Sequence, residues 1–351
     1  MNAYLQINNK KIGSGHSVFI IAELSANHNQ NFDNAVKLIK EAKKAGADAV
    51  KLQTYTPDTI TINCSNEYFQ IKQGTIWDGK TLYDLYKEAY TPWEWQPKLK
   101  EIAENESLIF FSTPFDKTAV DFLEDMDVPA YKIASFEITD IPLIEYIASK
   151  GKPIIISTGI AILSDIEEAI NACRRMNNNQ IALLKCTSAY PSPLEEVNLK
   201  TIPNMIKTFK TIVGLSDHTL GISVPVAAVA LGAKIIEKHF TLSRGMGGPD
   251  AAFSLEPEEF KQMVKSVREV EKALGDVSYE LSEKTKKSRE FSRSLFVVKD
   301  IKKGDVFTEE NVRSIRPGFG LHPKYYKDIL GKKATKDIKK GTPLNWNLIG
   351  W

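Results

Sequence analysis

TIVGLSDH (residues 211–218) and IIEKHFT (residues 235–241) are two short apolar runs, each ending in a histidine that polar loop residues follow. The segment between them, SVPVAAVALGA (223–233), is apolar almost all round and has the length of a buried helix. Two buried strands joined by a helical crossover pair in parallel, because the crossover returns the chain to the same end of the sheet. The pattern predicts a strand–helix–strand unit with one histidine at the carboxyl end of each strand.

Six further runs of this kind precede these two, and amphipathic helical patterns separate them. They are VFIIAEL (18–24), AVKLQTY (49–55), LIFFSTP (108–114), AYKIAS (130–135), PIIIST (153–158) and IALLKCT (181–187). Eight strand–helix units in about 275 residues predict an α/β fold, a closed (β/α)8 TIM barrel over residues 1–280. An open doubly wound sheet would share the alternation, but no G-x-G-x-x-G follows the first run.

The composition changes after residue 280. Residues 281–291 are polar and charged, which predicts a linker or a connecting helix, whereas residues 292–351 contain short strand patterns and Gly/Pro turns. The sequence KDIKKG occurs at 299–304 and again at 336–341, which predicts two similar turn units in a small all-β domain. This domain has 13 Lys+Arg and 6 Asp+Glu, a net charge of +7, and the remainder of the chain has a net charge of −5.

Several classes of protein are disfavoured by the composition. MNAYLQINNKK has no apolar core of a signal peptide, and Pro225, Gly232 and Lys234 interrupt the most apolar stretch. Three cysteines are too few and too scattered for a disulfide framework or a zinc cluster. No nucleic-acid-binding motif accompanies the basic residues. We therefore expect a cytoplasmic protein with no membrane segment and no nucleic-acid partner.

Ionisable and polar side chains stand at the carboxyl ends of the predicted strands, where barrel enzymes carry their active sites. Lys51 and Lys132 lie inside the strands, and a lysine facing a barrel interior is costly unless it is paired or meets an anion. Two interpretations remain open here. The lysines either have a structural role, in which they snorkel to solvent or pair with Glu23 and Glu137, or they line a pocket for a ligand that carries carboxylate and phosphate groups.

The two strand-end histidines, His218 and His239, lie on neighbouring strands of the predicted barrel. Period-two alternation places Ser216 on the same face as His218, and Glu237 on the same face as His239. Two imidazoles with nearby carboxylates suit a divalent metal ion such as Mn²⁺, and Glu23 or Asp250 would then serve in proton transfer. Two hydrogen-bonded structural histidines are the alternative.

Many segments together resemble one family, the phosphoenolpyruvate-dependent synthases of nonulosonic acids, which includes sialic acid synthase. The resemblance covers nearly the whole chain and includes AELSANHNQ (22–30), VKLQTY (50–55), FFSTPFD (110–116), YKIASFE (131–137), ISTGIA (156–161), KCTSAYP (185–191), GLSDHT (214–219), EKHFTLSRGMGGPD (237–250) and FSRSLFVVKDIKKGDVFTEENVRSIRPGFG (291–320). It implies the condensation of phosphoenolpyruvate with the open aldehyde form of an N-acetylated amino sugar and the release of phosphate. It also implies that residues 292–351 form an antifreeze-protein-like (SAF) domain.

The resemblance also implies roles for particular residues. The positions that match the family's phosphoenolpyruvate ligands are Lys51, Thr113, Lys132, Ser135, Ser157 and Ser216. Those that match its metal ligands are His218 and His239, with Mn²⁺ as the expected ion and Mg²⁺ or Co²⁺ as alternatives. Positions near the sugar and the reacting carbons are Glu23, Glu137, Ser188, Tyr190 and Asp250. Arg316 matches an arginine that the family's C-terminal domain inserts into the partner subunit's site, which implies a domain-swapped homodimer.

The chain departs from the sialic acid synthases at the sugar end. It has Ser188 where they have Asn, and GPDAAFS, with Ala251 and Phe253, where they have a histidine after GPD. These departures resemble the pseudaminic acid branch, whose substrate is 2,4-diacetamido-2,4,6-trideoxy-L-altrose. An N-acetylneuraminic or legionaminic acid synthase is the alternative within the family. Two alternatives lie outside the family. One is a Schiff-base aldolase that uses Lys132 or Lys185 as its nucleophile, and the other is a non-enzymatic carbohydrate-binding protein.

Overall fold

The computed structural model describes residues 4–72 and 74–350. The chain forms two compact units, one that ends at Gly275 and one that begins at Asp276. Among the described residues, no helix combines the length and the apolar character needed to cross a membrane. The two units are described in turn.

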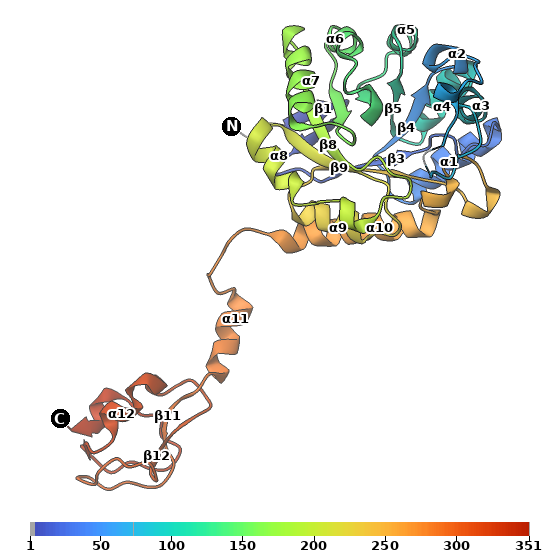
Figure 1. Ribbon diagram of the computed structural model, residues 1–351. Coiled ribbons are helices and arrows are strands. Elements are labelled where there is room, and N and C mark those ends of the chain that lie inside the picture. Colours follow the sequence, from blue (N-terminus) through green and yellow to red (C-terminus); the bar gives the residue numbers. More distant parts are fainter. Residues whose placement is uncertain (1–3, 73, 351) are drawn as a thin grey trace. The chain divides into compact units, whose positions relative to one another are not determined.

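The N-terminal unit is a closed barrel of parallel strands, which confirms the predicted fold class (Figure 1). Each predicted apolar run supplies one strand, and consecutive strands pair around the ring until β10 closes it against β3. The strands are β3 (Phe19–Glu23), β4 (Ala49–Thr54), β5 (Ile109–Pro114), β6 (Tyr131–Ile133), β7 (Ile154–Ser157), β8 (Ile181–Cys186), β9 (Ile212–Asp217) and β10 (Ile235–His239).

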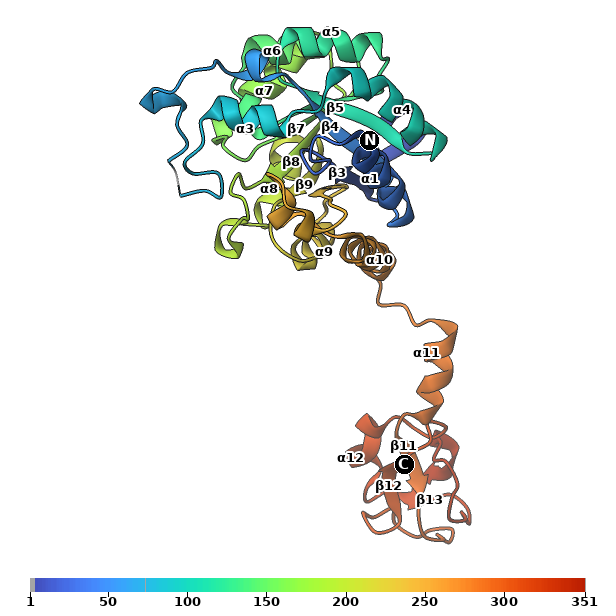
Figure 2. The same cartoon turned by 90° about the vertical axis from the view of Figure 1, so that its right-hand side faces the viewer.

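Helices cover the outside of the barrel and bury one apolar face each against the strands. They are α1 (Phe32–Lys44), α4 (Gln96–Asn105), α5 (Lys117–Asp125), α6 (Ile141–Ala148), α7 (Leu163–Arg175), α8 (Thr201–Phe209), α9 (Ser223–Ala230) and α10 (Pro257–Leu274). An excursion between β4 and α4 contains α2 (Pro57–Ile60) and α3 (Leu82–Ala89). Figure 2 shows part of this excursion extending beyond the helices beside it.

The strand positions that face the barrel interior are apolar near the amino ends and polar near the carboxyl ends. In β10, for example, Ile235 belongs to the interior apolar cluster, and Glu237 and His239 follow it on the same face. An N-terminal hairpin, β1 (Tyr4–Ile7) and β2 (Lys10–Gly13), adds Leu5, Ile7 and Ile12 to that cluster. The hairpin therefore closes the apolar end of the barrel and leaves the polar end as the place for a site.

The C-terminal unit has its own apolar core and few regular elements. Its helices and strands are α11 (Glu283–Ser288), β11 (Ser294–Val297), β12 (Val312–Ile315), α12 (Tyr326–Ile329), β13 (Lys333–Ala334) and β14 (Ile349–Gly350). The predicted linker, residues 281–291, falls within this unit. Its last residues join the domain, because the amide of Gly318 donates a hydrogen bond to the carbonyl of Glu290 (2.8 Å).

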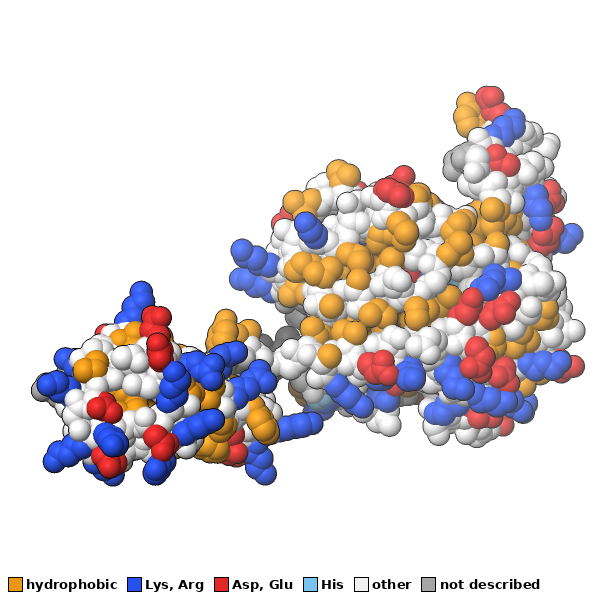
Figure 3. All heavy atoms as spheres, turned by 90° about the horizontal axis from the view of Figure 1, so that it is seen from below, with side chains coloured by type: hydrophobic (Ala, Val, Ile, Leu, Met, Phe, Trp, Pro, Cys, Tyr) orange, Lys and Arg blue, Asp and Glu red, His pale blue; other side chains and the backbone are white. Residues whose placement is uncertain are grey.

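The two KDIKKG copies bind one another in this unit. Ile301 and Ile338 exchange both backbone hydrogen bonds (2.9 and 2.8 Å). The aspartate of each copy accepts a hydrogen bond from a lysine amide of the other copy, at 2.8 Å for both Asp337 with Lys303 and Asp300 with Lys340. The internal repeat is thus a symmetric pair of turns. Figure 3 shows Lys and Arg side chains spread over the visible face of this unit, in keeping with its net positive charge.

Candidate active site

Two lysines and two glutamates meet inside the barrel, near the carboxyl ends of its strands. Lys51, on β4, forms an ion pair with Glu23 of β3, and it donates a hydrogen bond to the hydroxyl of Thr113 (3.1 Å). Lys132, on β6, donates to the hydroxyl of Ser157 (2.7 Å) and lies 3.6 Å from a carboxylate oxygen of Glu237. All of these side chains are buried. Their convergence shows that alternate positions on separate strands form one charged cluster.

The pairing that the sequence offered is confirmed for Lys51, whose partner is Glu23, and is wrong for Lys132. The carboxylate beside Lys132 is Glu237, not Glu137, because Glu237 points into the barrel from β10 and Glu137 lies in a short 3-10 helix, Ser135–Glu137, after β6. Ser216 donates a hydrogen bond to Glu237 (3.0 Å). Five of the six predicted phosphoenolpyruvate residues (Lys51, Thr113, Lys132, Ser157 and Ser216) therefore lie around this cluster.

The cluster holds one carboxyl group with an unusual proton affinity. Burial raises the pKa of Glu23 to about 7, although the charge of Lys51 opposes the shift. A carboxyl group that titrates near neutral pH can both release and accept a proton under physiological conditions. One oxygen of Glu237, Oε2, is buried with no hydrogen-bond partner among the described residues. This oxygen leaves the cluster with an unused acceptor that faces the same interior.

The histidine rings lie next to one another, with centroids 5.3 Å apart. Nδ1 of His218 lies 3.0 Å from the carbonyl of Thr187, and because a carbonyl only accepts, this nitrogen carries a proton. Burial lowers the pKa of His218, but Cys186 and Thr187 outweigh burial and raise this pKa, so Nε2 offers its lone pair to a metal ion only once the ring has lost its second proton. Nδ1 of His239 is buried without a hydrogen-bond partner among the described residues. Burial lowers the pKa of His239 well below its usual range, so the ring is neutral at pH 7.

The two rings fit a metal ion better than they fit two structural histidines, since a structural His239 would use its buried nitrogen in a hydrogen bond. Within residues 4–72 and 74–350, no group of three His, Cys, Asp or Glu side chains is arranged to hold a metal ion. A two-histidine site would therefore take its other ligands from water and substrate. Such a site has the open positions that a catalytic ion needs.

A third buried ion pair, on the outer face of the sheet, supports these histidines. Lys238 forms an ion pair with Asp217 and a hydrogen bond with the carbonyl of Thr219. Asp217 in turn accepts hydrogen bonds from the amide and the hydroxyl of Thr219 (3.0 and 2.8 Å). The pair links β9 to β10 and fixes the chain on both sides of His218. Sequence analysis missed it, although a charged residue between two inward-facing positions of a buried strand was the available signal.

Polar and aromatic residues form the rim above the histidines. The hydroxyls of Ser135 and Ser188 lie 2.7 Å apart. The ring centroids of Tyr190 and His218 are 4.5 Å apart, and those of Phe253 and His239 are 4.9 Å apart. Asp250, in the glycine-rich loop after β10, accepts a hydrogen bond from the hydroxyl of Ser25 in the loop after β3. The predicted residues Ser135, Ser188, Tyr190 and Asp250 thus surround the mouth of the barrel.

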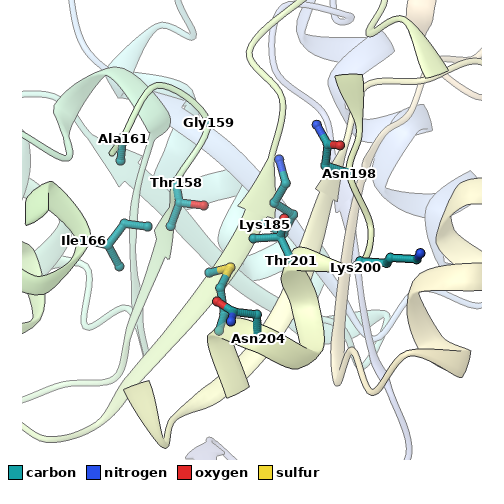
Figure 4. Close-up of a pocket in the computed structure, with 10 residues that line it drawn as sticks. Thr158, Gly159, Ala161, Ile166, Lys185, Asn198, Lys200, Thr201 and Asn204 are labelled. Atoms are coloured by element: carbon teal, nitrogen blue, oxygen red, sulfur yellow. The ribbon is translucent and has the colours of Figure 1, made fainter. Parts of the chain in front are cut away.

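Lys185 lies outside this interior. It occupies an outward-facing position of β8, where its ammonium group donates to the carbonyl of Cys186 (2.7 Å). Figure 4 shows it in a cavity of about 470 Å³ that Thr158, Asn198, Thr201 and Asn204 also line. This placement argues against Lys185 as a Schiff-base nucleophile at the interior site, because successive strand residues point to opposite faces.

The chain also matches known proteins along nearly its full length. The NeuB family matches residues 38–279 and the SAF domain matches residues 292–349. The chain belongs to the NeuB family. It is 52% identical over 340 residues to the pseudaminic acid synthase of Campylobacter jejuni, covering 97% of this chain and 98% of the relative. It is 50% identical over 327 residues to the pseudaminic acid synthase of Helicobacter pylori, covering 93% and 96%.

A solved structure of a sialic acid synthetase is similar to most of this chain. The N-acetylneuraminic acid synthetase of Leptospira borgpetersenii, in complex with citrate, gives a TM-score of 0.74 at 33% identity, covering 83% of this chain and 96% of that one. The predicted family and the predicted SAF domain are confirmed. Arg316 lies exposed in the C-terminal unit, and its role, like the roles of the barrel residues, stays a prediction.

Glu137, in the 3-10 helix after β6, allows the effect of burial on a carboxyl group near the site to be tested without substrate. Burial raises its pKa to about 7, so between pH 4.5 and pH 7 the folded protein binds a proton that the unfolded chain has lost. Folded-state stability therefore falls as pH rises through this interval, by up to about 3 kcal/mol. Glu137→Gln removes the ionisation, and we expect the variant to melt close to the parent at pH 4.5 and at a higher temperature than the parent at pH 8.

The matched control is Glu258→Gln, on the exposed surface of α10, where the side chain is 87% exposed. Its melting temperature should follow that of the parent at both pH values. A Glu137→Gln variant that gains nothing over the parent at pH 8 would show that Glu137 is well solvated.

Proposed function

We propose that the chain is a pseudaminic acid synthase. It would condense phosphoenolpyruvate with 2,4-diacetamido-2,4,6-trideoxy-L-altrose, in its open-chain aldehyde form, and release phosphate. The observation that carries the proposal is the convergence of Lys51 and Lys132, each with a hydroxyl partner, inside a NeuB-family barrel. The identity of about half of all residues to two pseudaminic acid synthases supports the choice of sugar.

The interior cluster suits phosphoenolpyruvate, which carries a phosphate and a carboxylate. Two ammonium groups and the hydroxyls of Thr113, Ser157 and Ser216 supply charge-assisted and neutral hydrogen bonds in a water-poor site. Glu23 and Glu237 lie beside the two lysines, so the protein's own charges in this cluster nearly balance. A bound anion would compete with these carboxylates for the ammonium groups, which favours the protonated form of Glu23.

The reaction needs one proton donor or acceptor close to the anion. Carbon 3 of phosphoenolpyruvate forms the new bond to the aldehyde carbon, the aldehyde oxygen takes up a proton, and water adds at carbon 2 before phosphate leaves. Glu23, with a pKa of about 7, lies where it can supply or remove such a proton. Asp250, which Ser25 holds at the mouth, is placed to hydrogen-bond a sugar hydroxyl.

We propose that His218 and His239 hold a divalent metal ion, Mn²⁺ in the first instance, with Mg²⁺ or Co²⁺ as alternatives. When bound, such an ion would polarise the aldehyde oxygen as a Lewis acid. The hydrogen bond from His218 to Thr187 and the Asp217–Lys238 pair orient the two rings. The rings need this support because a displaced imidazole cannot share an ion with its neighbour.

The sugar end of the site combines polar and apolar surfaces. Phe253 is buried with its ring against that of His239, and Ala251, also buried, stands where the sialic acid synthases have a histidine after GPD. An apolar surface suits a 6-deoxy methyl group better than a hydroxyl, because a hydroxyl buried there would lose its hydrogen bonds. We also propose a cytoplasmic location and a domain-swapped homodimer in which Arg316 enters the partner subunit's site.

Substrate choice tests the proposal directly. With phosphoenolpyruvate and Mn²⁺, phosphate release should be about 100-fold faster, as kcat/KM, with the diacetamido altrose than with N-acetylmannosamine. The panel should include a diacetamido trideoxy stereoisomer of the legionaminic type. Equal use of N-acetylmannosamine would favour a sialic acid synthase, and preference for the stereoisomer would favour a legionaminic acid synthase.

Metal dependence has its own test. Chelation by EDTA should abolish turnover, and Mn²⁺ should restore it. His218→Ala and His239→Ala should each weaken Mn²⁺ binding, measured by calorimetry on the substrate-free protein, about tenfold or more. Full activity after chelation, or unchanged Mn²⁺ binding in both variants, would contradict the metal assignment.

Mixing two inactive variants tests the domain swap. Arg316→Ala lacks the arginine and His239→Ala lacks a metal ligand, so each homodimer should be inactive. In a swapped heterodimer, the barrel with intact His239 receives the intact Arg316 of the other chain, and we expect about half of the sites to work. If each domain serves its own barrel, every site in the heterodimer lacks one group, and a verified heterodimer stays inactive.

A further inference from the structure

Trp77 lies at the mouth of the barrel, although it comes from the excursion between β4 and α4, in the part that precedes α3. Its indole nitrogen donates a hydrogen bond to the carbonyl of Pro249 (2.9 Å), and Pro249 immediately precedes Asp250. Its ring centroid is 5.6 Å from that of Tyr190. The neighbouring Ile76 is 52% exposed, whereas Trp77 is half-buried against these two partners. The indole is thus held to the active-site loops rather than to its own segment.

The contacts of Trp77 extend a continuous series of rings. Tyr190 lies against both His218 (4.5 Å) and Phe253 (5.2 Å), and Phe253 lies against His239 (4.9 Å). The series therefore runs from the paired histidines in the barrel to the excursion above it. The other aromatic contacts of this region, such as Tyr55 with Phe115, belong to a separate group. Trp77 is the outermost member of this aromatic wall, which consists of His239, His218, Phe253, Tyr190 and Trp77.

Such a wall has a chemical preference. Aromatic faces present a broad apolar surface, and a partly buried Trp keeps its N–H satisfied by a hydrogen-bond partner at its edge. Here Pro249 is that partner, which fixes the ring beside Tyr190. Methyl groups and the C–H faces of a sugar pack on such surfaces, and hydroxyls do not. A sugar with a 6-deoxy carbon and two acetamido methyl groups offers three such apolar groups.

We propose that Trp77 is a specificity residue that contacts the sugar. Its indole packs on an apolar group of the diacetamido sugar, and its hydrogen bond to Pro249 holds the ring in that position. The inference rests on the proposed function for the class of substrate. It assigns to the excursion a part in selecting the sugar, with no part in binding phosphoenolpyruvate.

The test compares two variants at Trp77 with a matched control. Trp77→Ala removes the ring, and Trp77→Phe keeps an aromatic surface but removes the N–H donor. Trp93→Phe is the control, because the indole of Trp93 also donates to a backbone carbonyl, that of Tyr55 (3.1 Å), and also lies against an aromatic ring, that of Phe122. Trp93 makes neither of the contacts that Trp77 makes with Tyr190 and Pro249.

Steady-state kinetics should separate the two substrates. We expect Trp77→Ala to raise the KM for the sugar about tenfold, to leave the KM for phosphoenolpyruvate unchanged, and to reduce the preference for the deoxy sugar over N-acetylmannosamine. Trp77→Phe should show a smaller rise, and Trp93→Phe should match the parent. An unchanged sugar KM in Trp77→Ala, or an equal rise in both KM values, would overturn the proposal, since the latter points to a general loss of loop order.

The proposed function and the Trp77 proposal fail in different ways. A parent protein that releases no phosphate with any sugar of the panel contradicts the function, whatever the variants do. A parent that uses N-acetylmannosamine as well as the altrose contradicts only the choice of sugar. The rise in KM for the accepted sugar then still decides the role of Trp77.

Discussion

Positive charge inside the barrel must be compensated, and the carboxyl-terminal half of the barrel interior is arranged around this constraint. Lys51 and Lys132 are buried among strands, where an unpaired ammonium group would cost several kcal/mol. Glu23 on β3 and Glu237 on β10 offset this cost, and these two strands lie next to each other in the barrel. Because the four charges come from four different strands, they are close together only when the barrel is closed.

The same arrangement would suit the anion that we propose as a substrate. A pocket with fixed lysines does not have to gather its charges when the ligand arrives, so less of the binding energy is lost to reorganisation. The compensation is incomplete, as the raised pKa of Glu23 and the unused oxygen of Glu237 show. The site therefore retains groups that a ligand, a metal ion or a proton can satisfy.

Loops from distant parts of the chain complete this site above the barrel. The Asp217–Lys238 pair fixes the strand ends that carry the histidines, and Asn29 donates to the carbonyl of Gly247 (3.1 Å), which joins the loop after β3 to the glycine-rich loop. A Cβ at Gly248 would lie 2.2 Å from Oδ1 of Asn29, so a larger residue would displace the side chain that makes this link. The aromatic wall, from His239 to Trp77, rests on loops that are held in this way.

Local sequence patterns were sufficient for the architecture of this protein, because apolar runs of strand length, separated by helical segments, allow few arrangements. The same patterns identified Lys51, Lys132, His218 and His239, since period-two alternation places each of them on the interior face. The motifs then identified the family. Those features depend on residues near one another in the chain.

Only the tertiary structure decided which of these groups meet. Lys132 pairs with Glu237 rather than Glu137 because Glu237 points into the closed barrel from β10, whereas Glu137 lies in the 3-10 helix after β6. Lys185 is as close to a strand end as Lys132, yet it faces outward, because one residue of register moves a side chain to the other face. Trp77 reaches Tyr190 and Pro249 across more than a hundred residues, and no local pattern specifies a contact that long-range packing creates.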